Sequence, residues 1–150
     1  MPKYKSVYFS ARHEREDDLR ENAAAKLQAA GVEIASRWYT HDRYRGRELD
    51  TYYIERTSWE DLERADVFVL LADDGFDSGR RHVEMGMALA LNKPMIVLAS
   101  KPENGWQRLP TVKVVKDWDS VVKLLVEDGS LPNVHHLDTS TAVVEPRNSS

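Results

Sequence analysis

Two apolar runs separated by a helix-like segment constrain the fold of this chain more than any other feature. The runs are DVFVLLA, residues 66–72, and PMIVLAS, residues 94–100, both rich in branched aliphatic side chains. Continuous apolar runs of this length are typical of strands that are buried on both faces of a parallel sheet. The segment between them, residues 80–92, carries apolar residues at helical spacing. Together the three segments predict a β-α-β unit.

The alternation of strands and helices continues on both sides of this unit. Strands are predicted at residues 5–10, 32–36 and 113–115, and helices at residues 14–30, up to about residue 65, and at 120–127. Short connections between alternating elements predict an α/β fold of three layers with a mainly parallel five-stranded sheet. We expect one domain over residues 1–127. Residues 128–150 are rich in Gly, Ser, Pro, Asn and Thr, and are expected to form an extended or disordered tail.

Composition argues against several classes of function. The chain has no cysteine, which excludes thiolate catalysis and cysteine-based zinc sites, and its five histidines show no metal-ligand spacing. It lacks the GxxxxGK[ST] and GxGxxG phosphate signatures. A net charge of −4 argues against binding a nucleic-acid polymer, although residues 41–47 are locally basic. No run approaches the roughly 20 apolar residues that span a bilayer, so no membrane contact is expected. We expect a cytoplasmic protein without a metal or other cofactor.

A single carboxylate, Glu84, stands in the first turn of the otherwise apolar helix at residues 80–92. At helical spacing it shares a stripe with Met87, Ala88 and Leu91, the stripe that should face a core. The helix N-terminus and the two arginines at 80–81 favour the ionised carboxylate. Ligands of parallel sheets bind where the strands end, so Glu84 is a candidate nucleophile or stabiliser of positive charge. An exposed ion pair with one of those arginines is the alternative that the helix alone leaves open.

Several motifs in a fixed order carry a resemblance to a known family. They are VYFSARHERED at residues 7–17, SRW at 36–38, ADVFVLLADD at 65–74 and GRRHVEMGMALALNKPMIVLASKPENGWQRLP at 79–110. Over about residues 5–118 the chain resembles the nucleoside 2-deoxyribosyltransferases, including their relatives that hydrolyse 2′-deoxynucleoside 5′-monophosphates. The resemblance implies a flavodoxin-like (Rossmann-type) fold and attack on an N-glycosidic bond.

The resemblance also implies roles for individual residues. Glu84 matches the nucleophilic glutamate of the family, and Tyr8 matches the aromatic residue that orients it. The residues that match sugar or phosphate contacts are Ser10, Ala11, Arg12, Asp77, Ser78, Gly79 and Arg80. Asn104 matches a polar residue that completes the site of a neighbouring subunit, which implies a homodimer or larger homo-oligomer. The apolar residues around the helix at 80–92 favour such an assembly independently.

One position departs from the family pattern. The aspartate that assists protonation of the departing base in the family falls on Ser58 here, and Asp61, one helical turn later, is the candidate substitute. Two functions therefore stay open. The chain is either an enzyme that passes the deoxyribosyl group of a small-molecule deoxynucleoside or deoxynucleotide to another base or to water, or a non-catalytic nucleotide-binding module on the same scaffold. Arg12 and Arg80 are the candidate ligands of a 5′-phosphate.

Overall fold

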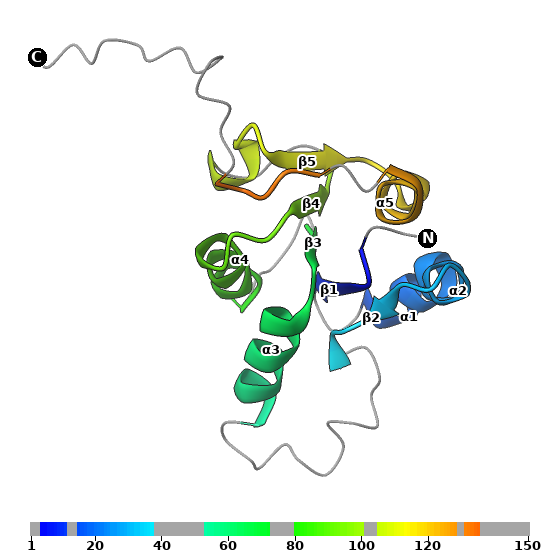
Figure 1. The fold of residues 1–150 in the computed structure, drawn as a ribbon, viewed down its shortest axis with the longest axis horizontal. Helices are drawn as coiled ribbons and strands as arrows, with labels where there is room; N and C mark the ends of the chain where they lie inside the picture. The colour runs from blue at the N-terminus through cyan, green and yellow to red at the C-terminus, as the bar shows by residue number, and fades with distance from the viewer. Residues whose placement is uncertain are drawn as a thin grey trace, which may run out of the picture.

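Five parallel strands form the centre of the computed structural model, which describes residues 4–11, 15–37, 53–72, 80–100, 105–128 and 131–135. The strands are β1 (Ser6–Ser10), β2 (Glu33–Ile34), β3 (Val67–Leu71), β4 (Met95–Leu98) and β5 (Val112–Val115). They pair in the order β2-β1-β3-β4-β5, and each neighbouring pair is parallel (Figure 1). This strand order is that of the flavodoxin-like fold, so the predicted fold class is confirmed.

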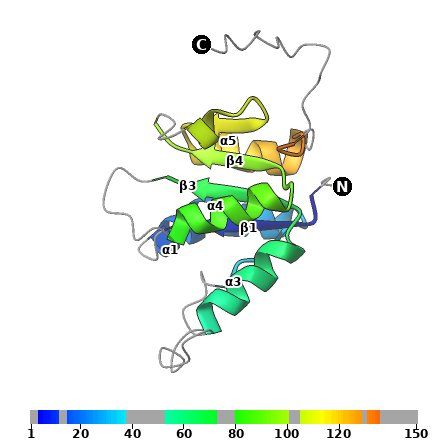
Figure 2. The same cartoon turned by 90° about the vertical axis from the view of Figure 1, so that its left-hand side faces the viewer.

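Helices cover both faces of the sheet. One face is covered by α3 (Tyr53–Arg64) and α4 (Arg80–Ala90), and the other by α5 (Trp118–Lys123) together with a long helix after β1 (Figures 1 and 2). That long helix runs continuously through α1 (Glu16–Leu19), a π-helical turn η2 (Arg20–Ala24) and α2 (Ala25–Ala29). A second π-helical segment, η6 (Leu124–Asp128), continues α5, and a short 3₁₀ helix, η5 (Gly105–Arg108), lies between β4 and β5. The predicted three layers are therefore present.

The central strands are buried along their whole length. Every residue of β1, β3 and β4 is buried, as their continuous apolar sequences predict. Burial of each large aliphatic or aromatic side chain contributes roughly 1.5–3 kcal/mol. The predicted strand at 32–36 is shorter in the structure, where β2 comprises only Glu33 and Ile34. Beyond it the Phe9 N–H donates to the Ser36 side-chain oxygen at 3.1 Å, so a side chain takes the place of the backbone ladder.

Two helices end in the same way, with a residue of positive φ. Gly31 (φ 85°) ends the helix after β1, as predicted, and Asn92 (φ 57°) ends α4. In both cases the next residue closes the end, because Val32 N donates to the Leu27 carbonyl at 2.8 Å and Lys93 N donates to the Ala88 carbonyl at 3.0 Å. These ends direct the chain back into β2 and β4.

Residues 131–135 contact the sheet and α4. The Leu131 N–H donates to the Tyr4 hydroxyl at 2.9 Å, and the Thr111 hydroxyl donates to the Val134 carbonyl at 2.7 Å. The His135 N–H donates to the Asn92 side-chain oxygen at 2.8 Å. Packing against the domain therefore extends past residue 127. Residues 136–150, most of the predicted tail, lie outside the described residues.

Candidate active site

The carboxyl ends of β1 and β3 mark the place where this fold binds ligands. The chain leaves β1 toward β2 on one side, and β3 lies on the other side of β1. Such a reversal of strand order opens a crevice outside the carboxyl ends of the two strands. In this chain that point lies beyond Ser10 of β1 and Leu71 of β3, and Ser10 pairs with Leu70 of β3 in parallel register.

Side chains of β1 alternate between the two helical layers. The Phe9 ring faces α5, where its centroid lies 6.0 Å from that of Trp118. Because successive strand residues point to opposite faces, Tyr8 and Ser10 face the layer of α3 and α4. The Tyr8 ring stacks on Phe68 of β3, with centroids 6.0 Å apart and planes within 8°. Tyr8 and Ser10 therefore lie on the same side of the sheet as the helix that carries Glu84.

Ser10 places a buried hydroxyl at the end of β1. The residue is fully buried, and its Oγ has no hydrogen-bond partner among the described residues. A buried polar atom of this kind is expected to have a partner, and at the mouth of a crevice a bound ligand can supply one. The substrate contact of Ser10 stays a prediction. The neighbouring Ala11 is half-buried and lies directly after the strand.

Glu84 lies on the face of α4 that packs against the sheet, just after the first turn rather than within it as the sequence predicted, because α4 begins at Arg80. It is 6% exposed, and Arg81, Met85 and Ala88 on the same stripe of the helix are 4%, 2% and 0% exposed. The helix contacts both β1 and β3. The carboxylate is therefore held inside the protein near the carboxyl ends of these strands. An exposed ion pair at a solvated helix start, the alternative for Glu84, does not describe this position.

Arg81 ties the first turn of α4 to the end of β3. Its Nη1 donates to the Leu71 carbonyl at 2.9 Å in a buried hydrogen bond. The guanidinium thus satisfies the last carbonyl of the strand and places a positive charge three residues before Glu84. Sequence analysis named Arg81 only as a possible ion-pair partner. Its anchoring of β3 follows from the tertiary structure.

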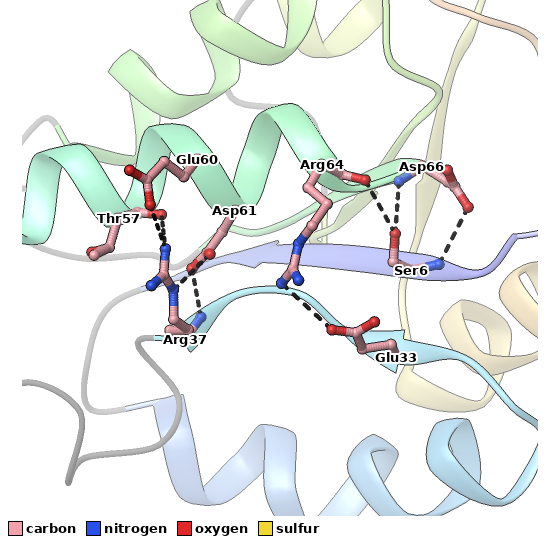
Figure 3. Close-up of polar contacts among 8 residues, drawn as sticks. All are labelled: Ser6, Glu33, Arg37, Thr57, Glu60, Asp61, Arg64 and Asp66. Atoms are coloured by element: carbon pink, nitrogen blue, oxygen red, sulfur yellow. Dashed lines mark hydrogen bonds and ion pairs between the residues drawn. The ribbon is translucent and has the colours of Figure 1, made fainter.

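Asp61 belongs to a polar cluster between α3 and the end of β2. One carboxylate oxygen accepts from the Arg37 backbone N–H at 2.9 Å, and the other accepts from Arg37 Nε at 2.7 Å (Figure 3). The same guanidinium donates to Glu60 at 3.0 Å and to the Thr57 carbonyl at 3.4 Å. Arg37 therefore joins β2 to two turns of α3.

The charges of this cluster change one another's pKa values. Burial raises the pKa of Asp61 above its ordinary value, against the hydrogen bonds and positive charge of Arg37, which lower it. Burial alone would lower the pKa of Arg37, but its hydrogen bond to Glu60 and the charge of Asp61 raise it above the ordinary value. Arg37 is therefore a permanent cation whose main partner is an almost fully buried carboxyl group.

Among the described residues, the Asp61 side chain bonds to Arg37 and not to Tyr8, Ser10 or Glu84. A pocket of about 380 Å³ beside Asp61 is lined by Glu33, Ile34, Ala35, Arg37, Glu60 and Arg64, and not by Tyr8, Ser10 or Glu84. Ser58, at the position of the family aspartate, is buried on the same helix with 8% exposure. A role for Asp61 in protonating a leaving base stays a prediction.

Asp66, which belongs to the ADVFVLLADD motif, lies at the opposite end of the sheet. Its carboxylate accepts from the Ser6 backbone N–H at 3.3 Å, and the Ser6 hydroxyl donates to the Arg64 carbonyl at 3.4 Å (Figure 3). The carboxylate also accepts from the Lys5 backbone N–H at 2.7 Å. These bonds connect the amino ends of β1 and β3. Asp66 is therefore structural, and part of the resemblance reflects the needs of the fold.

Several predicted site residues fall outside the described residues. They are Arg12, Asp77, Ser78, Gly79 and Asn104, and for Arg80 only the backbone at the start of α4 is described. Residues that sequence reasoning missed are Arg37 and Ser36, which follow β2 in the SRW motif, and Thr57 on α3. The SRW motif could have pointed to Arg37, because it places a cation directly after a predicted strand.

Among the described residues, no group of three or more His, Asp and Glu side chains is arranged to hold a metal ion.

An apolar groove lies on the outer side of α4. It measures about 570 Å³ and is lined by His82, Met85, Gly86, Leu89 and Trp106. Val83 of α4 and Trp106 of η5 are each 64% exposed. Met85, by contrast, is buried in the core, and Met87, Leu89 and Leu91 are partly buried against it. Met85 and Leu89, two of the apolar residues of this helix, thus line the groove, while Val83 and Trp106 are the large apolar residues that are most exposed around it. In the described part of the chain, no helix has the length and apolar character needed to cross a membrane.

Solved structures with the same fold include two enzymes that act on nucleosides or nucleotides. A 2-deoxyribosyltransferase from the psychrotolerant bacterium Bacillus psychrosaccharolyticus matches with a TM-score of 0.60 and 18% identity, over 78% of this chain and 90% of its own. The CMP N-glycosidase BcmB from Clostridium botulinum matches with a TM-score of 0.56 and 19% identity, over 81% of this chain and 97% of its own. No protein-family model and no curated protein sequence matches the chain. The resemblance to 2-deoxyribosyltransferases is thus confirmed at the level of the fold.

Proposed function

We propose that this protein cleaves the N-glycosidic bond of 2′-deoxynucleosides or their 5′-monophosphates through Glu84. The observation that carries the proposal is the buried carboxylate of Glu84 near the start of α4, on the side of the sheet that Tyr8 and Ser10 face. The fold shared with a 2-deoxyribosyltransferase and a CMP N-glycosidase supports the same class of reaction. The proposal needs no cofactor.

The chemistry follows from an ionised carboxylate below a sugar ring. A Glu84 oxygen attacks the anomeric carbon and forms an ester, while the C–N bond breaks and the base leaves with the electron pair and takes up a proton. The developing positive charge at the anomeric carbon is stabilised by the carboxylate. A water molecule or a second base then attacks the same carbon and releases Glu84. The first acceptor gives hydrolysis and the second gives transfer.

Base release is the measurement that tests this proposal. Purified protein is incubated with deoxynucleosides, their 5′-monophosphates and CMP, each with and without a second base, and free base is quantified by chromatography. Release without an added base identifies a glycosidase, and a new nucleoside in its presence identifies a transferase. If no substrate of the panel releases base, the enzymatic proposal is wrong.

A non-catalytic nucleotide-binding module is the second candidate. The observation that favours it is Asp61, the candidate proton donor, whose two carboxylate oxygens both accept hydrogen bonds from Arg37. Such a module binds a monophosphate in titration calorimetry and releases no base. Binding without turnover across the panel would therefore support this candidate over the first.

We expect Arg12 and Arg80 to distinguish a nucleotide from a nucleoside substrate. If they bind a 5′-phosphate, Arg12→Ala or Arg80→Ala should lower kcat/KM for the monophosphate about ten- to a hundredfold more than for the matching nucleoside. The reason is that each charge-assisted hydrogen bond contributes roughly 1.5–3 kcal/mol. The nucleoside serves as the internal control. Equal losses on both substrates would assign the arginines to the sugar or the scaffold and favour a nucleoside transferase.

We also expect a homodimer or larger homo-oligomer that uses the groove on α4. A Cβ atom added at Gly86 meets nothing within 4 Å, and Gly86 lines the groove, so we expect Gly86→Leu to leave the monomer folded and to obstruct the groove. Light scattering at micromolar concentration should show an oligomer for the wild type and a shift toward monomer for Gly86→Leu and Trp106→Ser. Trp59→Ser, which changes a 42% exposed tryptophan on α3, is the matched control. A monomeric wild type would contradict the assembly and the role of Asn104 in a neighbouring site.

A further inference from the structure

Arg81 is the one buried cation among the residues whose side chains the structure describes. Its exposure is 4%, whereas the other described arginines and lysines are half-buried or exposed. A guanidinium stays charged at every pH at which proteins are folded. Burying such a charge is costly unless an anion and hydrogen-bond acceptors lie close to it. The position of Arg81 therefore needs a reason in the fold or in the site.

One partner of Arg81 is the end of β3. Its Nη1 donates to the Leu71 carbonyl at 2.9 Å, and both residues are buried. The bond fixes the first turn of α4 against the strand that ends at the candidate active site. A carbonyl oxygen carries no net charge, so this bond satisfies a donor without neutralising the cation.

Glu84 is the buried anion on the same face of α4. It follows Arg81 by three positions, a spacing at which the Cβ atoms of a helix are about 5–6 Å apart. The other buried carboxylates of the described residues are Glu16 and Asp61, and each has an arginine partner outside α4, at 2.8 and 2.7 Å. Arg81 and Glu84 are therefore the buried cation and the buried anion of one helix face.

The elements packed against α4 bring no other buried cation to this face. The helix contacts β1, β3 and α3. Tyr8 is the one titratable residue of β1, and β3 has none. The buried charged residue of α3 is Asp61, while His82 of α4 is exposed, as are the remaining charged residues of α3, which are Glu55, Arg56, Glu60, Glu63 and Arg64.

We propose that Arg81 is a positioning residue that holds Glu84 ionised and fixed at the end of β3. The guanidinium charge favours the anionic form of a carboxyl group one helical turn away. The bond to Leu71 fixes the turn that precedes Glu84. The inference rests on the proposed function, in which only the ionised carboxylate attacks the anomeric carbon. Arg81 itself takes no part in making or breaking bonds.

The test separates the charge of Arg81 from its hydrogen bond. Arg81→Gln keeps a donor and removes the charge, and Arg81→Lys keeps both a donor and the charge. The matched control is Arg64→Gln, which removes a 59% exposed cation from α3.

The pH profile of kcat/KM is measured with a substrate that the wild type cleaves. Its acid limb should move up by about one pH unit or more in Arg81→Gln, because an opposite charge at this distance shifts a carboxyl pKa by about 1–3 units. Activity then falls about tenfold or more at the acid end and less than about threefold at high pH. Arg81→Lys and the control should keep the wild-type profile. A loss that is equal at every pH would make Arg81 purely structural and overturn the inference.

Carbon NMR of ¹³C-labelled glutamate side chains gives a readout that does not depend on activity. The Glu84 carboxyl signal is assigned with Glu84→Gln, and its titration midpoint should rise by about one pH unit or more in Arg81→Gln. An unchanged midpoint overturns the inference. A wild type that releases no base overturns the proposed function instead, and the midpoints still decide whether Arg81 controls the ionisation of Glu84.

The folding of the variants tests the same inference. If Arg81→Gln unfolds, the double variant with Glu84→Gln should fold, because it leaves no buried charge without a counter-charge on this helix face. A double variant that also unfolds would mean that the guanidinium serves the fold whatever the charge at position 84, and would overturn the inference.

Discussion

Glu84→Gln is expected to abolish base release and to leave the fold intact. The substitution keeps the size of a buried side chain and removes the charge that would attack the anomeric carbon. Loss of a nucleophile typically costs on the order of 10⁴-fold or more in kcat. The measurement is base release from the best substrate of the panel, together with thermal unfolding of both proteins. Glu84→Ala should give a loss of the same order.

Glu63→Gln is the matched control for Glu84, because it changes an exposed glutamate on α3. It should retain wild-type activity. A folded Glu84→Gln protein that cleaves at near the wild-type rate would assign Glu84 a structural role and contradict the mechanism. If base release survives only in part, kinetics with a second base test whether a covalent intermediate forms, because such an intermediate gives a ping-pong pattern.

Arg37→Met is expected to destabilise the protein by about 3 kcal/mol at pH 7. The variant leaves the 2% exposed Asp61 carboxylate without its cation, and the partial exposure of Arg37, 27%, places the effect at the lower end for a buried pair. A change of this size lowers the melting temperature of a domain of this length by roughly 6–12 °C. Urea unfolding measures the free energy directly.

The loss of unfolding free energy caused by Arg37→Met should be smaller at pH 4 than at pH 7. Burial holds the pKa of Asp61 above its ordinary value of 3.8, so the stability linked to its protonation is present below that value and is lost as pH rises through the raised folded value. Without Arg37 the folded pKa rises further, so the variant loses more stability than the wild type between acid and neutral pH. If the difference in unfolding free energy between the wild type and Arg37→Met is constant from acid to neutral pH, the effect does not come from the ionisation of Asp61.

Two further variants isolate the pair. Arg37→Met combined with Asp61→Asn should recover much of the lost stability, since the amide carries no charge that must be paired. Arg64→Met changes a residue of the helix that carries Asp61 and removes its ion pair with Glu33 of β2, at 3.4 Å and with side chains 59% and 62% exposed. It should cost less than about 1 kcal/mol. An equal cost for Arg64→Met and Arg37→Met would show that burial of Asp61 is not the cause.

The architecture could be predicted because its signals are local. The apolar runs that became β3 and β4 are buried at every position, and the helix between them begins where the repeat of apolar residues begins. Gly31 adopts the positive φ that ends the helix after β1. The residue at which β2 ends could not be predicted, because the Phe9 N–H donates to the Ser36 side chain and not to a backbone carbonyl. The sequence does not show whether the side-chain oxygen or the carbonyl oxygen of a serine will accept the hydrogen bond from the neighbouring strand.

The candidate site was predictable in part. Helical spacing placed Glu84 on an inward stripe, and its 6% exposure agrees with that placement. An exposed ion pair between Glu84 and Arg80 or Arg81 was the alternative left open, but Arg81 is buried and bonded to the end of β3. Asp61 was named for a catalytic role, and the structure adds its partner Arg37. No spacing rule connects a residue after a strand with one that lies 24 positions later on a helix.

The sequence by itself determined the order and type of the elements, the parallel sheet and the inward position of Glu84, because continuous apolar runs and the 3.6-residue helical period are patterns of neighbouring positions. Only the tertiary structure decided which distant groups meet. Arg37 with Asp61, Arg81 with Leu71 and Asp18 with Trp118 are pairs set by helices docking on a sheet, and their partners lie 24, 10 and 100 positions apart. The physical reason is that a buried polar group takes whichever partner the packing brings within about 3 Å.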